Sequence, residues 1–456
     1  MPTPHLDPPH LERALPQVGP VTIIIDGLEQ IADENASNLR WLPATLPPRC
    51  SLLLSAALGS RAAKAVAQRG WEQTVTMQML TKPMKRNLIE NYLERLHKTF
   101  EEDVMKELVE AEQTDNPLFL NMTIEELVTT AVFETVHEIV KNILSQSSAL
   151  DLCIMVLARY ESDFGRQLVE KAFVYIHCSR FGIGEDELLA LLDVPLDKWS
   201  PFYLSARRTL AVNGGLLNIC NHVMSTAVRT RYLSGEAQVT IAHQELLFFF
   251  ETAHEDVVSV ARRQEEAPFH MLHSGSYDAL QRFVLNLNNF KLLWATRKFD
   301  LHVYWRAIGG GALPKDIGTQ YTDKLESYKR DMRKAVEAEF AEFDTRKENA
   351  VLDRMSQLIA KLGEFLRELG HYESAAMLQK RALDIDHQLF NNMSRRVAES
   401  TTALAKTKHL QVTKVNVCNS CNHLAKTKHL QVPHTCRAAL TTAAGPRTAP
   451  ALPPNR

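Results

Sequence analysis

Three short apolar runs near the amino end predict β-strands. Val21–Ile25 is β-branched throughout, and such a run is typical of a strand buried on both faces of a parallel sheet. Cys50–Leu54 is a second apolar run, and prolines at positions 43, 47 and 48 prevent a helix before it. Thr74–Leu80 alternates apolar and polar residues, which predicts a third strand. Together these runs predict half of a doubly wound α/β sheet.

Helical periodicity dominates the next stretch, residues 84–140, with one break. The break is Asp115–Pro117, where the apolar spacing is lost. Thr123 is followed by Glu126 three residues later, which predicts the N-cap of a new helix at Thr123.

Residues 149–250 show the order of helices and strands that is typical of a winged helix. The predicted elements are helices at Phe164–Cys178, Glu185–Leu192 and Pro201–Val212, a strand at Gly214–Cys220 and a helix at Val223–Tyr232. Some winged helices bind DNA through a basic helix. No basic recognition helix of this kind is visible around the predicted strand, where Arg207, Arg208, Arg229 and Arg231 are scattered. We therefore expect no nucleic-acid partner.

The segment Leu358–Phe390 predicts a helical hairpin of the 34-residue repeat type. Gly363, Ala375 and Ala382 fall where such a hairpin needs small residues, so that its two helices can approach closely. A further helix is predicted near Val397. Beyond it the sequence LAKTKHLQV occurs twice, 20 residues apart, too short an offset for a two-helix repeat. We expect an irregular tail after residue 405.

Composition and charge narrow the class of protein. A chain of 456 residues suits two to four domains. Lys and Arg number 52 and Asp and Glu number 54, which gives no general nucleic-acid surface. No apolar run is long enough to span a bilayer, and the Pro-rich start lacks the features of a signal peptide. Seven scattered cysteines indicate reduced thiols in a cytoplasmic protein.

An acidic pair follows the first predicted strand. Ligands bind at the carboxyl ends of parallel strands, so Asp26 and Glu29 could reach a metal or a phosphate. The pattern is typical of a Walker-B strand, in which Asp26 would hold Mg²⁺ and Glu29 would orient the attacking water. Apolar strands that end in Asp also occur without this role. The phosphate-binding loop GxxxxGK[ST] should precede Asp26 and occurs nowhere in the chain. We therefore expect a chain truncated before this strand, without ATP hydrolysis.

In their order, these stretches resemble a STAND-type, NACHT-like P-loop NTPase, and most closely the nephrocystin-3 family. The resemblance runs from about Val21 to Leu404. It rests on the motifs IIIDGLEQI, WLP, NPLFL, GIGEDELL, GGLL, DLHVYWRAIG and LGEFLRELG followed by QKRALDI.

The resemblance implies a switch that binds ATP or ADP with Mg²⁺ under a closing winged helix, and a tetratricopeptide solenoid that binds proteins. It makes Asp26 the Walker-B acid and metal ligand, and Glu29 the second acid. It places Pro117 near the base and His222 near the β-phosphate. Pro117 alternatively serves only to break a helix, and His222 only as a core histidine. The resemblance also implies the primary cilium, partners of the inversin and nephrocystin type, and a role in Wnt signalling.

The predicted fold is mainly α with a partial α/β sheet, an incomplete P-loop NTPase sheet, at the amino end. The predicted parts are a disordered leader (1–20), the second half of a P-loop core (21–82), a helical lid (83–148), a winged helix (149–250), a helical spacer (251–345), tetratricopeptide-like repeats (346–405) and an irregular tail (406–456).

Three functions stay open. The first is a protein-interaction scaffold with a degenerate nucleotide module, and the second is a working nucleotide switch. The third is a winged-helix nucleic-acid binder. Zinc is not expected, because the one cluster with zinc-like spacing lies in the duplicated tail, at Cys418, Cys421, His423, His434 and Cys436.

Overall fold

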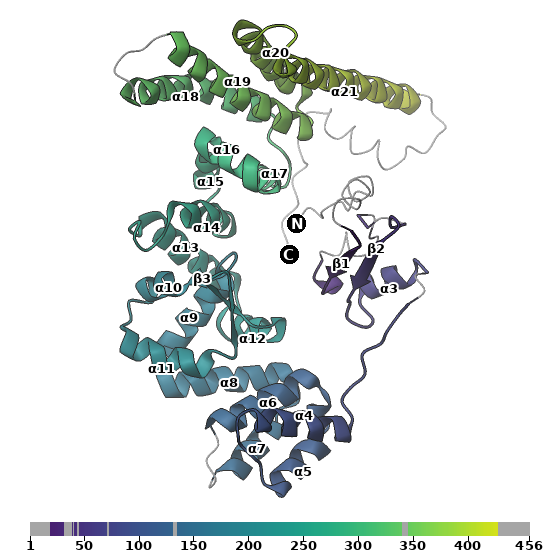
Figure 1. Cartoon of the computed structure of the whole chain (residues 1–456), viewed down its shortest axis with the longest axis vertical. Helices are drawn as coiled ribbons and strands as arrows, with labels where there is room; N and C mark the ends of the chain where they lie inside the picture. The colour runs from purple at the N-terminus through teal and green to yellow at the C-terminus, as the bar shows by residue number, and fades with distance from the viewer. Residues whose placement is uncertain are drawn as a thin grey trace, which may run out of the picture. The chain divides into compact units, whose positions relative to one another are not determined.

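A computed structural model describes residues 19–31, 39, 41–42, 45–70, 73–130, 135–339 and 345–426. The chain divides into two compact units, one ending at His270 and one beginning at Met271. The described residues are mostly helical, with a small sheet at the amino end (Figure 1). This confirms the predicted mainly α fold. No helix in the described part of the chain is long and apolar enough to cross a bilayer.

The described residues begin with a two-stranded parallel sheet. Strands β1 (Val21–Ile25) and β2 (Cys50–Leu54) have the bounds that the sequence predicts. The short helix η1 (Leu28–Gln30) follows β1, and α3 (Arg61–Ala67) follows β2. A small core packs on one face of the sheet, formed by Leu28, Leu39, Trp41, Leu42, Ala62 and Ala65.

Two predictions about this sheet are wrong. The other face is not buried, since Ile24 and Leu53, which pair directly, are 68% and 60% exposed. Thr74–Leu80 is not a strand. Its alternating Val75 and Met77 are 85% and 86% exposed, and the Leu80 N–H donates instead to the Asp115 carbonyl at 2.8 Å. An alternating pattern forms a strand only where a neighbouring strand is available, and here the segment leads into a helical region.

The segments predicted as a helical lid and a winged helix share one hydrophobic core in the first unit. The lid comprises α4 (Lys82–Glu94), α5 (Glu102–Glu110), η2 (Gln113–Asp115), α6 (Pro117–Thr130) and α7 (Val136–Leu144). The predicted N-cap at Thr123 is wrong. Thr123 lies inside α6, where its hydroxyl donates to the Phe119 carbonyl at 2.8 Å. The cap is Asn116, because its carboxamide oxygen accepts from the Leu118 N–H at 2.8 Å.

The segment predicted as a winged helix contains helices and three short strands, which form an antiparallel sheet in the order β3-β5-β4. The elements are α8 (Ala149–Phe164), α9 (Arg166–Cys178), β3 (Ile183–Gly184), α10 (Glu185–Leu192), α11 (Leu196–Ala206), β4 (Leu210–Asn213), β5 (Leu216–Ile219), α12 (His222–Tyr232) and α13 (Glu236–Thr252). Helix α11 ends earlier than predicted, because Leu210–Asn213 pairs with β5. Buried rings of Tyr160, Phe173, Trp199 and Phe202 pack edge-to-face or stacked at the centre.

Helices continue through the second unit, as predicted. They are α14 (Val260–His273, which crosses the boundary), α15 (Tyr277–Leu285), α16 (Leu287–Thr296), α17 (Lys298–Ile308), α18 (Ile317–Glu339), α19 (Thr345–Glu368), α20 (Tyr372–Leu389) and α21 (Arg395–Lys426). The predicted hairpin is present as α19 and α20. Ala375 and Ala382 are buried between these helices, and Gly363 lies against Gln379.

The tail prediction is wrong as far as residue 426. Helix α21 continues from Arg395 to Lys426, through the first copy of LAKTKHLQV and beyond it. This stretch contains no Gly or Pro, so nothing in the local sequence ends the helix even though the apolar stripe is lost. The predicted leader, apart from residues 19 and 20, and the tail beyond 426 lie outside the described residues.

Replacing Gly363 by leucine should destabilise the second unit. A Cβ atom at Gly363 would lie 2.6 Å from Cγ of Gln379 and 3.3 Å from the Ala375 carbonyl oxygen. We expect overpacking to lower the free energy of unfolding by about 2 kcal/mol, measured by calorimetry. Lys361→Leu, on the same helix but half-buried, is the matched control. Equal losses in the two variants would show that the close approach at Gly363 is not the cause.

Candidate functional site

Asp26 and Glu29 lie together at the carboxyl end of the two-stranded sheet. Asp26 follows β1, and Gly27, with a φ of 69°, turns the chain into η1, which carries Glu29. Ser55 follows β2; its hydroxyl donates to the Asp26 carboxylate and accepts from the Gly27 N–H at 2.8 Å. The Ala57 N–H donates to the Glu29 carboxylate at 3.0 Å. Parallel pairing therefore brings both acids to one exposed edge.

This edge offers oxygen ligands of the type that Mg²⁺ prefers. Both carboxylates are exposed, so a hydrated cation could approach them. Each already accepts a hydrogen bond from the chain, Asp26 from Ser55 and Glu29 from Ala57. The sequence contains no phosphate-binding loop. Asp26 and Glu29 therefore fit a cation better than a nucleoside triphosphate. The metal-ligand role of Asp26 and the catalytic roles of Asp26 and Glu29 stay predictions.

Pro117 is the exposed first residue of α6. This position suits proline, which has no N–H to donate and whose φ is already helical. Pro117 therefore marks a helix boundary, as the alternative interpretation holds. Its predicted contact with a base stays a prediction.

A buried lysine holds the turn before Pro117. The Lys85 ammonium donates to the Asp115 carboxylate at 2.6 Å, the Ala111 carbonyl at 2.8 Å and the Thr114 hydroxyl at 3.1 Å. The Lys85 side chain is only 1% exposed, so three acceptors compensate for the loss of water around its charge. Sequence reasoning missed Lys85, because nothing near it in the sequence marks it as buried.

His222 is the first residue of α12 and is exposed. The preceding Asn221 caps the helix, since its carboxamide oxygen accepts from the Met224 N–H at 2.9 Å. The alternative interpretation of His222 as a core histidine is therefore wrong. An exposed histidine at a helix N-terminus is placed where an anion could bind, and its predicted phosphate contact stays a prediction.

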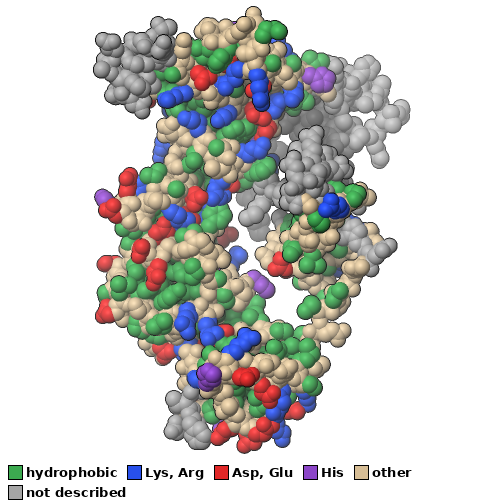
Figure 2. Space-filling view, in the orientation of Figure 1, with side chains coloured by type: hydrophobic (Ala, Val, Ile, Leu, Met, Phe, Trp, Pro, Cys, Tyr) green, Lys and Arg blue, Asp and Glu red, His purple; other side chains and the backbone are tan. Residues whose placement is uncertain are grey.

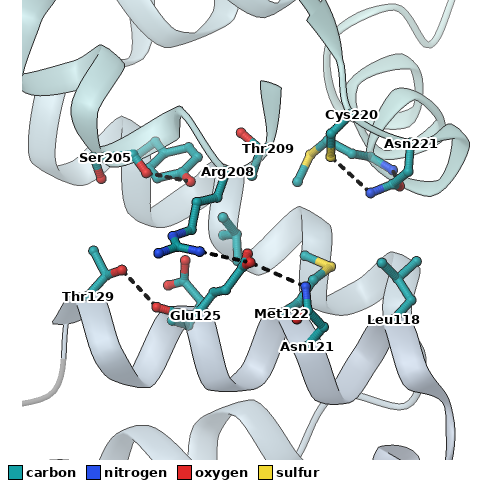
Figure 3. Close-up of a pocket in the computed structure, with 14 residues that line it drawn as sticks. Leu118, Asn121, Met122, Glu125, Thr129, Ser205, Arg208, Thr209, Cys220 and Asn221 are labelled. Atoms are coloured by element: carbon teal, nitrogen blue, oxygen red, sulfur yellow. Dashed lines mark hydrogen bonds and ion pairs between the residues drawn. The ribbon is translucent and has the colours of Figure 1, made fainter. Parts of the chain in front are cut away.

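A cavity of about 240 Å³ is lined by residues adjacent in sequence to Pro117 and His222. Its lining includes Leu118, the neighbour of Pro117, and Asn221, the neighbour of His222, but neither Asp26 nor Glu29. Figure 3 shows α6 forming one wall, with residues from the end of α11 and the start of α12 opposite. The lining is Leu118, Asn121, Met122, Glu125, Glu126, Thr129, Val156, Tyr160, Ser205, Arg208, Thr209, Cys220, Asn221 and Met224.

A basic residue, Arg208, and an acidic residue, Glu125, form an ion pair in the lining of this cavity. A guanidinium nitrogen of Arg208 lies 3.4 Å from the Glu125 carboxylate, and the Asn121 amide donates to the same oxygen at 3.3 Å. Burial raises the pKa of Glu125, and the charge of Arg208 opposes this shift only in part. Arg208 also donates to the Tyr92 hydroxyl at 2.5 Å. Sequence reasoning noted Arg208 only as part of a weak basic set and missed Glu125.

No family model matches the chain. A TPR repeat-containing protein of Dictyostelium discoideum is 22% identical, over 80% of this chain and 22% of its own length. Tetratricopeptide repeat protein 41 of Mus musculus is 23% identical, over 80% of this chain and 32% of its own length. Nephrocystin-3 of Mus musculus is 24% identical, over 85% of this chain and 28% of its own length. The chain is a distant relative of tetratricopeptide-repeat proteins.

This relationship supports the predicted resemblance to tetratricopeptide-repeat proteins and to nephrocystin-3. The chain spans at most about a third of the length of each of these relatives. The assignment to STAND or NACHT NTPases stays a prediction.

The zinc-like cluster lies outside the described side chains. Cys418, Cys421 and His423 fall on the last part of α21, where only the backbone is described, and His434 and Cys436 lie beyond it. Elsewhere in the described chain, no three His, Cys, Asp or Glu side chains are grouped so that they could hold a metal ion.

Proposed function

We propose that this chain is a protein-interaction scaffold whose binding surface is built on α19, α20 and α21. The observation that carries the proposal is the close stacking of these three helices, with Gly363 against Gln379 and buried alanines between α19 and α20. Stacked helical hairpins present extended surfaces for partners. The distant tetratricopeptide-repeat relatives support the same interpretation.

The partner is expected to present an acidic segment. Helix α21 carries six Lys and Arg residues but one acidic residue, Glu399. Lys406 and Lys408 on this helix are exposed. Lys and Arg side chains are also prominent on the visible face of the second unit (Figure 2). An acidic partner would be attracted to such a surface, and salt would weaken the attraction.

The resemblance to nephrocystin-3 suggests which proteins to test. We propose partners of the inversin and nephrocystin type at the primary cilium, and through them a role in Wnt signalling. The support for this finer proposal is the similarity to nephrocystin-3 over 85% of the chain.

Equilibrium binding of a purified inversin-type protein to the full chain tests the proposal. We expect micromolar or tighter binding that weakens as salt increases. The double variant Lys406→Glu/Lys408→Glu should bind more weakly. The double variant Lys64→Glu/Lys82→Glu, which changes two exposed lysines of the first unit and therefore the net charge by the same amount, should bind like the wild type. Absence of binding, or equal loss in both variants, would contradict the proposal.

A second candidate, a nucleotide switch, is favoured by the grouping of Asp26, Glu29 and Ser55 at one sheet edge. We propose, however, that this sheet edge is a degenerate remnant of a nucleotide-binding module and no longer works as a switch. The chain alone is therefore expected to show no measurable ATP hydrolysis. Binding of a fluorescent ADP or ATP analogue with Mg²⁺, by the wild type and by Asp26→Ala, is the measurement. Micromolar binding lost in Asp26→Ala, or turnover that depends on Glu29, would favour the switch.

Helix α11 carries little basic charge for nucleic-acid binding. Its one Lys or Arg residue is the exposed Lys198, and its exposed Leu196 and Leu204 are apolar. A helix that reads DNA instead presents free basic and amide side chains to the groove.

A further inference from the structure

We propose that the cavity between α6 and α12 binds an α-amino acid with an apolar side chain, its ammonium at Glu125 and its carboxylate at Arg208. This is a small-molecule site within the first unit, separate from the helices proposed to bind proteins.

The hydrogen bonds from Arg208 and Asn121 to the Glu125 carboxylate are long. Its contacts with Arg208 and Asn121 are 3.4 Å and 3.3 Å, whereas charge-assisted hydrogen bonds to carboxylates are usually about 2.7–2.9 Å long. The Tyr92 hydroxyl, which is uncharged, is the third group that interacts with it. The Glu125 side chain is 19% exposed, so water satisfies it only in part. The raised pKa of Glu125, caused by burial, agrees with a carboxylate that lacks compensation. An ammonium group would bring three strong donors to this position.

Arg208 has donors to spare on the same side of the cavity. One of its nitrogens donates to Tyr92 and approaches Glu125. Within the described residues, its remaining N–H groups make no hydrogen bond to protein. A planar guanidinium binds a carboxylate through two parallel hydrogen bonds, so the free side of Arg208 suits the carboxylate of an amino acid. Figure 3 shows the Arg208 side chain reaching from the opposite wall toward Glu125 on α6.

The size of the cavity and its apolar lining determine which amino-acid side chain fits. The cavity, about 240 Å³, is smaller than the roughly 300–1,000 Å³ of pockets for drug-sized molecules. Met122, Val156 and Met224 supply apolar lining, and methionine side chains adapt to ligands of different shape. A ligand about the size of leucine or methionine fits these limits.

The charges of the cavity favour a neutral zwitterion over a phosphate. Glu126 is neutralised by Arg159, through contacts of 2.8 Å and 2.9 Å. Glu125 and Arg208 then leave a net charge of zero, arranged as a dipole that a zwitterion complements. A nucleotide diphosphate would place several negative charges beside Glu125 and Glu126 with one guanidinium available, which like-charge repulsion disfavours.

Calorimetric titration of the full chain with L-leucine and L-methionine tests the site. We expect binding at millimolar or lower concentration. Leucinamide, which lacks the carboxylate, and 4-methylpentanoate, which lacks the ammonium, should each bind at least about tenfold more weakly, since each leaves one charged side chain unpaired. Chemical shifts of the Met122 and Met224 methyl groups should change with L-leucine and locate the ligand.

Variants of Arg208 and Glu125 then test which charged group of the ligand each side chain binds. Arg208→Met and Glu125→Gln should each weaken leucine binding at least about tenfold, and Arg208→Lys should fall between wild type and Arg208→Met, because lysine keeps the charge without the fork. Arg207→Met, an exposed neighbour outside the lining, is the matched control and should bind normally. A thermal unfolding scan of each variant checks that it is folded.

Three results would overturn the proposal. The first is no heat and no methyl shift with either amino acid up to about 10 mM, where binding would be weaker than about −3 kcal/mol. The second is leucine binding that both Arg208→Met and Glu125→Gln leave unchanged. The third is ADP binding that shifts the Met122 and Met224 methyl groups and displaces leucine, which would assign the cavity to a nucleotide.

Discussion

Asp386→Ala is expected to lower the free energy of unfolding of the second unit by about 4 kcal/mol. The Asp386 carboxylate is fully buried in α20. It accepts from the Ser356 hydroxyl of α19 and the Ser400 hydroxyl of α21, each at 2.5 Å. The Arg396 guanidinium lies 3.9 Å away. Hydrogen bonds to a charged group contribute about 1.5–3 kcal/mol each, and alanine would leave both hydroxyls without this acceptor.

The loss should appear first as detachment of α21. Calorimetry would measure the change in stability, and amide hydrogen exchange would show whether α21 opens before α19 and α20 do. Asp384→Ala, on the same helix but exposed, is the control and should change stability by less than about 0.5 kcal/mol. If Asp384→Ala were as costly as Asp386→Ala, the buried carboxylate would not be the tie between the three helices.

Lys85→Met is expected to destabilise the lid of the first unit by about 3 kcal/mol. Methionine can fill much of the buried volume but cannot donate to Asp115, Ala111 or Thr114. Breaking a buried ion pair usually costs about 3–5 kcal/mol, and the low end applies because the Asp115 side chain is 39% exposed and can turn to water.

Hydrogen exchange of the α4, η2 and α6 amides would follow this loss within the lid. Lys82→Met is the matched control, since Lys82 lies three residues earlier and pairs with Glu110 in solvent, with side chains 59% and 53% exposed. An exposed pair contributes less than about 1 kcal/mol. Faster exchange in Lys82→Met than in Lys85→Met would contradict the account of the turn before Pro117.

Local pattern predicted β1, β2, β5 and most of the helices, because each depends on neighbours in sequence. It missed β3 and placed most of β4 inside a helix. The bounds of β1 and β2 follow from two β-branched or apolar runs, and the α19–α20 hairpin follows from its small residues. The same logic failed for Val75 and Met77, whose alternation is that of a strand although no strand pairs with them. Strand formation depends on a partner, which a local pattern does not show.

The acid pair could be predicted from local sequence, whereas the charged pair of the cavity could not. Asp26 and Glu29 could be placed at the sheet edge because the end of a parallel strand has a defined position in the fold. Glu125 and Arg208 could not, since they lie 83 residues apart and meet only through the packing of α6 against the winged helix. Lys85 and Asp115, 30 residues apart, meet across a turn whose path no local motif specifies.

The two-stranded sheet also bears on the order in which this chain acquires its structure during translation. Its pairs join residues 29 positions apart, whereas the helices after it close contacts within a few residues. Sheets with distant pairing form slowly, and ribosomes add about 5–20 residues each second. Val21–Ile25 must therefore wait for Cys50–Leu54, which follows it out of the ribosome about 1.5–6 s later. During that interval Val21–Ile25, with five β-branched residues and no charge, is an unpaired strand that could pair with another chain.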